Sequence, residues 1–344
     1  MPNLQVGYWA GQEQYDPSAL LTFARHAEVV GFDIIVTSDH FHPWRDSLGH
    51  AGFPLVWLSA VASQTINTEL GTAVTTPMFR YHPAIVAQAF ATLDYMFPGR
   101  FFVTLGTGHK MNETPLGFEW PGFEEKVKRL EEAIEIIQLL WAGDFVNYDG
   151  QYYTLKNAKL YTKPKKKIPI YIATYSPKVA DIAGRLCDGI LTNPRGLENH
   201  EKILGSMKNA ADNVGKNSSE LTTCMEFKVA YDVDYDKALA SAIYWAPTAI
   251  PRKVRENISN PREFEDKIGD AEIEKIKSTW LITTDSDSII KRLGDFLEYG
   301  YNRVYIHSAS PKEERFLDLL GRDVLPWMRE YYETLVNPTS IAFD

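Results

Sequence analysis

The stretch "FDIIVTSDHFHPW", residues 32–44, is the most informative about the fold, because a buried strand ends in it and polar chemistry begins at once. Its first half is continuously apolar, as expected for a strand covered on both faces. Its second half places Asp39, His40, His42 and Trp44 directly after that strand. Polar side chains at the carboxyl ends of buried parallel strands are typical of α/β enzymes. The stretch therefore predicts a parallel sheet with an active site at that edge.

Eight strand-like runs of this kind alternate with helical patterns along the chain. They span residues 4–9, 32–38, 69–75, 101–108, 168–175, 188–193, 222–232 and 303–309. Eight alternations are the count for a (β/α)8 TIM barrel, and the first strand lacks the GxGxxG of a dinucleotide-binding sheet. We expect a single decorated barrel domain over residues 1–344, with insertions at about 142–167 and 233–280.

Composition narrows the function classes. A net charge of −9 argues against a nucleic-acid partner, which needs a basic surface. The N-terminus lacks a secretory signal pattern, and no apolar run is long enough to cross a membrane, so we expect a cytoplasmic protein with no membrane partner. Cys187 and Cys224 lie in apolar runs, and we expect both to be buried thiols.

The pair His40 and His42 also allows a metal site. Such a pair opens metal-dependent hydrolase barrels, because alternate strand residues point the same way. Those enzymes need further histidines after the fifth and sixth strands and an aspartate after the eighth. Here these strands end in "ATYS", "TNPR" and His307, so we expect no metal and keep the hydrolase as an alternative from a different class.

Several segments together resemble one known family. They are "SDHFHPW" (38–44), "TPMFRYHPAIVAQAFATLDYMFPGR" (76–100), "GTG…NE" (106–113), "YIA…SPKVADIAGRLCDG" (171–189) and "YWAP" (244–247). In this order they resemble the coenzyme F420-dependent dehydrogenases of the bacterial luciferase-like superfamily. The nearest groups are the glucose-6-phosphate and the secondary alcohol dehydrogenases. The resemblance implies F420 as coenzyme, an alcohol or sugar as substrate, and a barrel with insertions that forms a homodimer.

The resemblance also implies catalytic roles. His40 matches the base that removes the hydroxyl proton while the carbinol carbon gives a hydride to the deazaflavin C5. Trp44 matches the substrate wall that offers an indole N–H to the substrate oxygen, and Glu13 matches an active-site acid. His109 stands where the family usually has a glutamate that manages the proton of the reduced ring. Histidine can also donate a proton, so we expect activity with a different pH dependence.

The coenzyme contacts implied by the resemblance come from several strand ends. They are Asp39, Ala73, Val74, Thr76, Thr107, Gly108, His109, Asn112, Ala173, Thr174, Tyr175, Ser176, Pro177 and Asn193. Ala73 and Val74 match a strand bulge behind the ring, often a non-proline cis peptide. Residues 173–177 match the region of the coenzyme phosphate and tail. That segment is usually glycine-rich, and here Tyr175 is expected to narrow it or to stack on the coenzyme.

The sugar-phosphate group of the family carries basic residues that hold the substrate phosphate. At the corresponding positions we read Gly196, Asp266 and Thr279, which cannot replace charge-assisted contacts. We therefore expect a neutral alcohol or another sugar derivative. A glucose-6-phosphate dehydrogenase with a rearranged phosphate site, a flavin-dependent monooxygenase of the same superfamily and a non-catalytic F420-binding protein stay open, as does the direction of the reaction.

Overall fold

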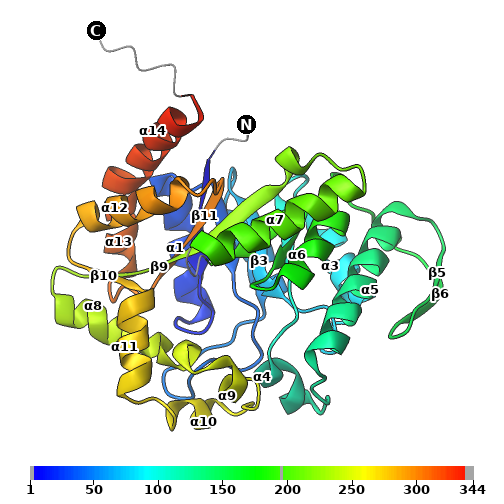
Figure 1. Cartoon of the computed structure of the whole chain (residues 1–344), viewed down its shortest axis with the longest axis horizontal. Coiled ribbons are helices and arrows are strands. Elements are labelled where there is room, and N and C mark those ends of the chain that lie inside the picture. Colours follow the sequence, from blue (N-terminus) through cyan, green and yellow to red (C-terminus); the bar gives the residue numbers. More distant parts are fainter. Residues whose placement is uncertain (1–3, 194–196, 338–344) are drawn as a thin grey trace.

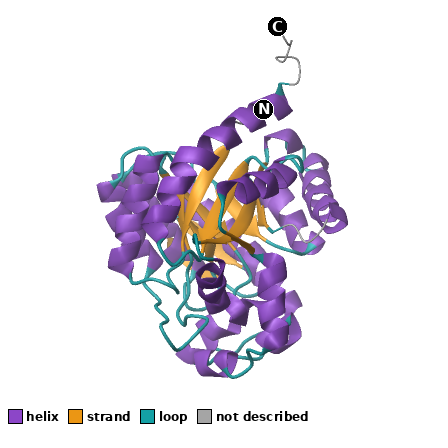
Figure 2. Cartoon of the chain, turned by 90° about the vertical axis from the view of Figure 1, so that its left-hand side faces the viewer, coloured by secondary structure: helices purple, strands orange, loops and turns teal. Residues whose placement is uncertain are grey.

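The computed structural model describes residues 4–193 and 197–337, and within them it forms a closed parallel barrel. The barrel strands are β1 (Gln5–Ala10), β2 (Ile34–Thr37), β3 (Glu69–Thr75), β4 (Phe101–Leu105), β7 (Ile170–Ala173), β8 (Gly189–Thr192), β9 (Thr222–Tyr231) and β11 (Arg303–Ser308). Every pairing between neighbours is parallel, and the pairing of β8 with β9 closes the ring. Figure 2 shows the strands enclosed by helices. The prediction of a (β/α)8 barrel is confirmed.

The helices that follow the strands cover the outside of the barrel. They are α1 (Pro17–Val30), α2 (Pro54–Gln64), α3 (Pro83–Met96), α5 (Phe123–Ala142), α6 (Pro177–Leu186), α7 (Leu197–Asn213), α12 (Ser286–Leu297), α13 (Glu313–Leu319) and α14 (Leu325–Val336). The ends of α1 show why the sequence folds this way. The Asp16 carboxylate accepts hydrogen bonds from the first turn, and Gly31 ends the helix with φ of 103°.

The two expected insertions have different structures. The first contains an antiparallel hairpin of β5 (Val146–Asp149) and β6 (Thr154–Ala158). The second contains α8 (Tyr235–Ala242), a 3-10 segment (Ile243–Ala249), α9 (Arg252–Arg255), α10 (Pro261–Glu265) and α11 (Asp270–Thr279). The short strand β10 (Leu281–Thr283) follows it and pairs with β9. Figure 1 shows α9, α10 and α11 at the same end of the barrel as the short helix α4 (Lys110–Glu113). We call the segment 243–279 the cap. The domain limits 1–344 stay a prediction.

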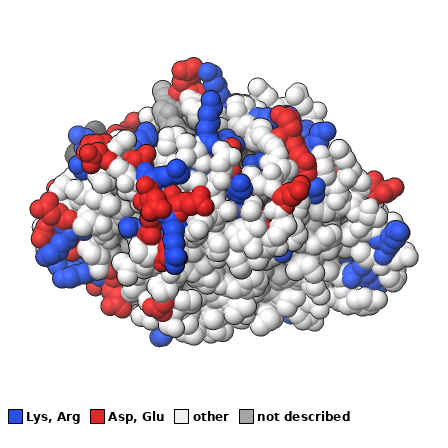
Figure 3. Space-filling model, turned by 90° about the horizontal axis from the view of Figure 1, so that it is seen from below, with Lys and Arg blue, Asp and Glu red and all other residues white. Residues whose placement is uncertain are grey.

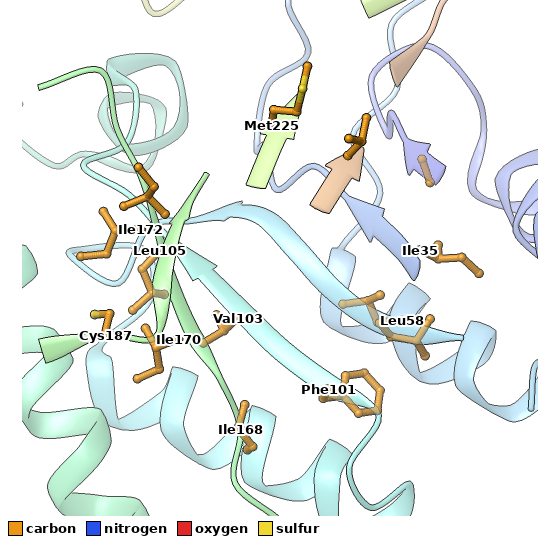
Figure 4. Close-up of a cluster of buried hydrophobic side chains, with 14 of the residues drawn as sticks. Ile35, Leu58, Phe101, Val103, Leu105, Ile168, Ile170, Ile172, Cys187 and Met225 are labelled. Carbon is orange, nitrogen blue, oxygen red and sulfur yellow. The ribbon is translucent and has the colours of Figure 1, made fainter. Parts of the chain in front are cut away.

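The core has two layers that follow from the alternation of side chains along the strands. Figure 4 shows part of the outer layer, where Ile35, Leu58, Val103 and Ile170 lie between strands and helices. The inner layer takes side chains from all eight barrel strands. Its buried members are Trp9, Ile34, Val36, Ala73, Phe102, Tyr171, Leu191, Cys224 and Tyr305. The ring of Tyr305 lies where a Cβ on Gly7 would be, at 2.6 Å, so a glycine is needed there.

The two cysteines are as expected. Cys187 and Cys224 are free and buried, and burial raises the pKa of the Cys224 thiol to about 11. Across residues 4–193 and 197–337, none of the helices combines the length and apolar character required to span a bilayer.

Candidate active site

A cavity of about 330 Å³ lies at the carboxyl ends of the barrel strands. Most of the residues predicted for the site line it. They are Glu13, Asp39, His40, Trp44, Ala73, Val74, Thr76, Thr107, Gly108, His109, Asn112, Ala173, Thr174, Tyr175 and Ser176. Pro177 and Asn193 do not line it. Pro177 begins α6, and the Asn193 amide lies 3.3 Å from the backbone oxygen of Glu226, to which it donates.

His40 is largely buried, with 12% of its side chain exposed, and lies beside two charged groups. Burial, and then the nearby Arg80 guanidinium, lower the pKa of His40 to about 4, against the opposing effect of Asp39. Its Nε2 atom lies 3.5 Å from Oε1 of Glu13, which is longer than a good hydrogen bond. At neutral pH the imidazole is therefore uncharged and able to accept a proton.

Glu13 sits between the first strand and the cap. Its carboxylate accepts a hydrogen bond from the Ser38 hydroxyl at 2.6 Å, and Tyr244 of the cap donates to its backbone oxygen. Burial nevertheless raises the pKa of Glu13 above its usual value. Glu13 thus links the ring of His40 to the cap while its ionised form is disfavoured.

Asp39 is held in place by three donors that the sequence did not single out. Arg80 donates to Oδ1 at 2.7 Å, Tyr81 donates to the same oxygen at 3.1 Å, and Thr75 donates to Oδ2 at 2.7 Å. The signal for Arg80 and Tyr81 was present, because "RY" interrupts an apolar segment directly after the third strand. This ion pair is buried, since the Arg80 side chain is only 8% exposed.

Trp44 and His109 complete an aromatic wall around His40. Ring centroids lie 5.3 Å apart for His40 and Trp44, 5.9 Å for His40 and His109, and 5.2 Å for Trp44 and His109. Burial, then Arg255, then His40 lower the pKa of His109 well below its usual value. The residue at the family's glutamate position is thus an uncharged imidazole at neutral pH.

The opposite wall is shaped for close approach by a flat group. The Ala73–Val74 peptide is cis, as the resemblance implied. A Cβ on Gly106 would lie 2.8 Å from Val74, and a Cβ on Gly108, where φ is 70°, would lie 2.7 Å from Thr76. Only glycines let this turn pack so tightly against β3. Together these residues pack closely on one part of the cavity lining, with no side chain at Gly106 or Gly108.

The rim beside this wall suits a coenzyme phosphate. Ser176 is the N-cap residue of α6, without a capping hydrogen bond from its side chain, and Pro177 is the first residue of the helix, so the positive end of the helix dipole points to the loop 173–176. Tyr175 lines the cavity and is 46% exposed.

Three positively charged side chains from α5 and the cap line the cavity, and the sequence analysis did not predict them. Lys126 from α5 and Arg252 and Arg255 from α9 line the cavity. Lys126 Nζ lies 4.0 Å from Glu256, Arg252 Nε lies 2.7 Å from the same carboxylate, and the Arg255 guanidinium lies 5.6 Å from the Trp44 ring centre. We call Lys126, Arg252 and Arg255 the cationic cluster. These positions belong to helices whose place over the cavity is set only by the fold.

The predicted phosphate positions do not line the cavity. Asp266 follows α10, Thr279 ends α11, and neither is among the lining residues. Gly196 lies outside the described residues. The charge at this end of the cavity comes instead from the cationic cluster.

A third group of lining residues was not predicted either. It comprises Trp9 from β1, Glu226 and Lys228 from β9, Trp245 from the cap and His307 from β11. The sequence showed His307 at the end of the eighth strand, but Glu226 and Lys228 lie within an otherwise apolar strand. Residues two apart on a strand point to the same side, so Glu226 and Lys228 lie on one face of β9. Two charged residues at this spacing in an apolar strand are the sequence signal that could have identified them.

The other histidine of the opening motif has a different environment. His42 Nδ1 lies 3.0 Å from the backbone oxygen of Ser259, so it joins the motif to the cap. Within residues 4–193 and 197–337, no group of three or more His, Cys, Asp or Glu side chains is arranged to hold a metal ion.

Comparison with known proteins agrees with this geometry. The model of the luciferase-like monooxygenase family matches residues 4–302, and the chain belongs to this family. Over 334 residues the chain is 40% identical to the F420-dependent glucose-6-phosphate dehydrogenase of Mycolicibacterium gilvum (strain PYR-GCK), covering 96% of this chain and 99% of that protein. The corresponding enzyme of Mycolicibacterium smegmatis is 39% identical, with the same coverage.

The solved structures give the same result. An F420-dependent secondary alcohol dehydrogenase in complex with an F420–acetone adduct superimposes with a TM-score of 0.89 at 33% identity, covering 94% of this chain and 99% of that one. The F420-dependent tetrahydromethanopterin reductase of Methanopyrus kandleri has a TM-score of 0.76 at 22% identity, and shares the fold.

Proposed function

We propose that this F420-dependent oxidoreductase acts on the carbinol carbon of an alcohol or a sugar, with His40 as the base. The observation that carries the proposal is the largely buried, uncharged imidazole of His40 in a cavity that Trp44 and the Gly106–Gly108 turn also line. The comparisons support the coenzyme, because the close relatives and the solved neighbour are F420-dependent.

Each residue then has a task at a stated atom. The bound deazaflavin would supply the hydride acceptor, and the wall of Ala73, Val74 and the Gly106–Gly108 turn would hold its ring. A ring nitrogen of His40 takes the hydroxyl proton, and the indole N–H of Trp44 orients the same oxygen. Burial of the rings excludes water from the reacting atoms. Asp39 accepts hydrogen bonds from three donors, and these contacts hold the segment beside His40 in place.

A second candidate substrate is a sugar phosphate, because of one observation. The cationic cluster places three positive side chains at the cap end of the cavity against the single carboxylate of Glu256. Charge-assisted hydrogen bonds from Arg and Lys are the usual way to hold a phosphate. The positions of Gly196, Asp266 and Thr279 were expected to provide no charged contact to a substrate phosphate. We infer that the cationic cluster holds the phosphate instead.

The reaction itself tests both candidates. Purified chain is mixed with oxidised F420 and with propan-2-ol, D-glucose or glucose 6-phosphate, and coenzyme reduction is followed spectroscopically. We expect reduction by at least one alcohol, and we expect Arg255→Met to raise KM for glucose 6-phosphate by roughly tenfold or more while propan-2-ol is unaffected. Coenzyme binding without reduction by any of them would favour a non-catalytic F420-binding protein.

We also propose a homodimer formed through α1 to α3. Large apolar side chains are exposed on these helices and at their ends. They are Val29, Phe53, Val56, Ile66, Ile85, Tyr95 and Met96. Exposed apolar residues in such number are typical of a protein interface. Sedimentation analysis should give a dimer, and Val56→Asp should shift it toward the monomer.

The remaining partner proposals follow from charge and thiols. Figure 3 shows acidic and basic side chains intermixed on the face seen there, and the net charge is −9, which supports an enzyme without a nucleic-acid partner. We propose that the protein works in the cytoplasm and without a membrane partner, and the free thiols of Cys187 and Cys224 are compatible with that compartment.

A further inference from the structure

The cavity has a polar corner that the roles proposed above leave unused. Trp9 of β1 and His307 of β11 are register partners in the barrel, and both line the cavity. Their rings are nearly parallel, with centroids 5.1 Å apart and planes at 11°. Trp9 is 9% exposed and His307 is 2% exposed, so the corner is dry.

Each ring carries one polar atom without a protein partner. Nε1 of Trp9 and Nε2 of His307 are buried, and neither has a hydrogen bond to any residue within 4–193 and 197–337. Buried polar groups in native proteins are nearly always paired with protein, water or a ligand. Two such atoms on facing rings at the edge of a substrate cavity therefore point to a bound group.

Glu226 determines which hydrogen-bonding role His307 can play. Oε1 of Glu226 lies 2.7 Å from Nδ1 of His307, and its Oε2 lies 3.4 Å from Nζ of Lys228. Although burial opposes it, Lys228 and then His307 lower the pKa of Glu226 to about 2. A permanent carboxylate can only accept, so the hydrogen sits on Nδ1 of His307. Burial also lowers the pKa of His307, so Nε2 is a bare acceptor at neutral pH.

The surrounding rings fix this acceptor in one orientation. Trp245 packs edge-on against His307 with centroids 4.4 Å apart, and Trp280 packs at 5.1 Å and 61°. Trp9 covers the remaining face of the imidazole. A ring held on three sides cannot rotate to find another partner, so the acceptor stays available to whatever enters the cavity.

The corner therefore offers one fixed donor and one fixed acceptor. An anion would meet a bare lone pair and the Glu226 carboxylate, and a cation could not use the indole N–H. A hydroxyl group both accepts and donates, so a single substrate hydroxyl can satisfy both atoms. We propose that Trp9 and His307 form a subsite for a second hydroxyl of the substrate, so that a polyhydroxylated alcohol is preferred over a simple secondary alcohol. Glu226 acts as a positioning residue through His307. This inference rests on the proposed function.

Two variants remove the polar atoms and keep aromatic rings. Trp9→Phe deletes the donor, and His307→Phe deletes the acceptor. With F420 bound, kcat/KM is measured for glucose 6-phosphate and for propan-2-ol. The ratio of interest is kcat/KM for glucose 6-phosphate divided by kcat/KM for propan-2-ol. We expect each variant to lower this ratio by roughly tenfold, as for the loss of one hydrogen bond in a dry site. Trp57→Phe is the matched control, because the Trp57 indole donates to the backbone oxygen of Pro17 and does not line the cavity, and it should leave the ratio unchanged.

Deoxy analogues separate a direct contact from a structural effect. Each monodeoxy derivative of glucose 6-phosphate is assayed with the wild type and with the two variants. For the derivative that lacks the contacted hydroxyl, Trp9→Phe and His307→Phe should be as active as the wild type. All other analogues should lose roughly tenfold. An equal loss for every analogue and for propan-2-ol would overturn the subsite and make the two residues merely structural.

Two binding measurements distinguish failure of the subsite from failure of the proposed function. Binding of D-glucose to the coenzyme-free chain is followed by ligand-observed NMR, and binding of F420 by fluorescence. If no alcohol reduces F420 but D-glucose binds to the wild type and not to His307→Phe, the proposed function is wrong and the subsite stands. If F420 is reduced but the variants leave the substrate ratio unchanged, the subsite is wrong. A loss of F420 affinity in the variants, with no change in the ratio, would assign the corner to the coenzyme and overturn it too.

Discussion

Two histidine–carboxylate pairs lie in the same cavity and behave differently. His40 and Glu13 are 3.5 Å apart, and burial raises the pKa of Glu13. His307 and Glu226 are 2.7 Å apart, and Lys228 helps to hold the pKa of Glu226 at about 2. The same two residue types thus form a loose pair, in which burial disfavours the carboxylate charge, and a tight pair, in which Lys228 favours it. We propose that the loose pair handles the proton of the reaction and that the tight pair fixes an orientation.

The largest effect should come from removing the imidazole of the loose pair. His40→Ala should lower kcat by about 10²- to 10⁴-fold, which is the usual contribution of a general base. F420 affinity, measured by fluorescence titration, should change less than about threefold, because other residues shape the coenzyme wall. His42→Ala is the control, since that ring contacts Ser259 outside the cavity. Equal losses of kcat in both variants would contradict the assignment.

The carboxylates of the two pairs should respond to pH with opposite sign. The lowered pKa of Glu226 stabilises the fold above about pH 4.5, and this contribution is lost as the pH falls toward 2. Glu226→Gln should therefore reduce the free energy of unfolding by about 2–3 kcal/mol at pH 7 and by less near pH 4. The raised pKa of Glu13 means that its ionisation is unfavourable as pH rises. Glu13→Gln should leave stability at pH 7 unchanged or higher, as measured by urea unfolding.

The His40 end also depends on the donors to Asp39. Thr75→Val removes one hydrogen bond to that carboxylate and should cost about 1 kcal/mol in the free energy of unfolding. Thr72 is a matched control on the same strand, because its buried hydroxyl has no hydrogen-bond partner within residues 4–193 and 197–337. Thr72→Val should be neutral or stabilising. If both substitutions lower the free energy of unfolding by the same amount, the hydrogen bond from Thr75 to Asp39 does not contribute to stability.

The smallest effect concerns pH and the unusual His109. Because burial lowers the pKa values of His40 and His109, neither ring should titrate near pH 6.5. The value of kcat for F420 reduction should vary less than about twofold between pH 6 and 8 and should fall below pH 5, where His40 gains a proton. His109→Gln should keep this shape, since both side chains are uncharged. A steep rise in kcat around pH 6.5 would indicate a solvated His40.

The sequence predicted most of the barrel and one side of the cavity. All eight predicted strands form the barrel, because strands buried on both faces are continuous apolar runs. Asp39, His40, Trp44 and the Gly106–Gly108 turn could be found because they follow strands directly, and the fold brings those strand ends together.

Other parts of the cavity could not be read from local patterns. Glu226 lies inside an apolar strand, and its role depends on Lys228 from the same strand and on His307 from the neighbouring strand β11. The cationic cluster comes from α5 and α9, whose placement over the cavity depends on tertiary packing. For the same reason the phosphate positions expected at Asp266 and Thr279 lie away from the cavity, and charge is supplied by residues with no sequence signal.

The central claim is that this cavity binds F420 and that His40 serves the chemistry done there. Parallel titrations of the purified chain with F420, FMN and NAD, followed by fluorescence, test it most directly, with His40→Ala titrated beside the wild type. We expect both proteins to bind F420 with similar affinity and to bind FMN and NAD at least about a hundredfold more weakly. Tight binding of FMN with no response to F420 would contradict the account and would identify a flavin-dependent member of the family instead.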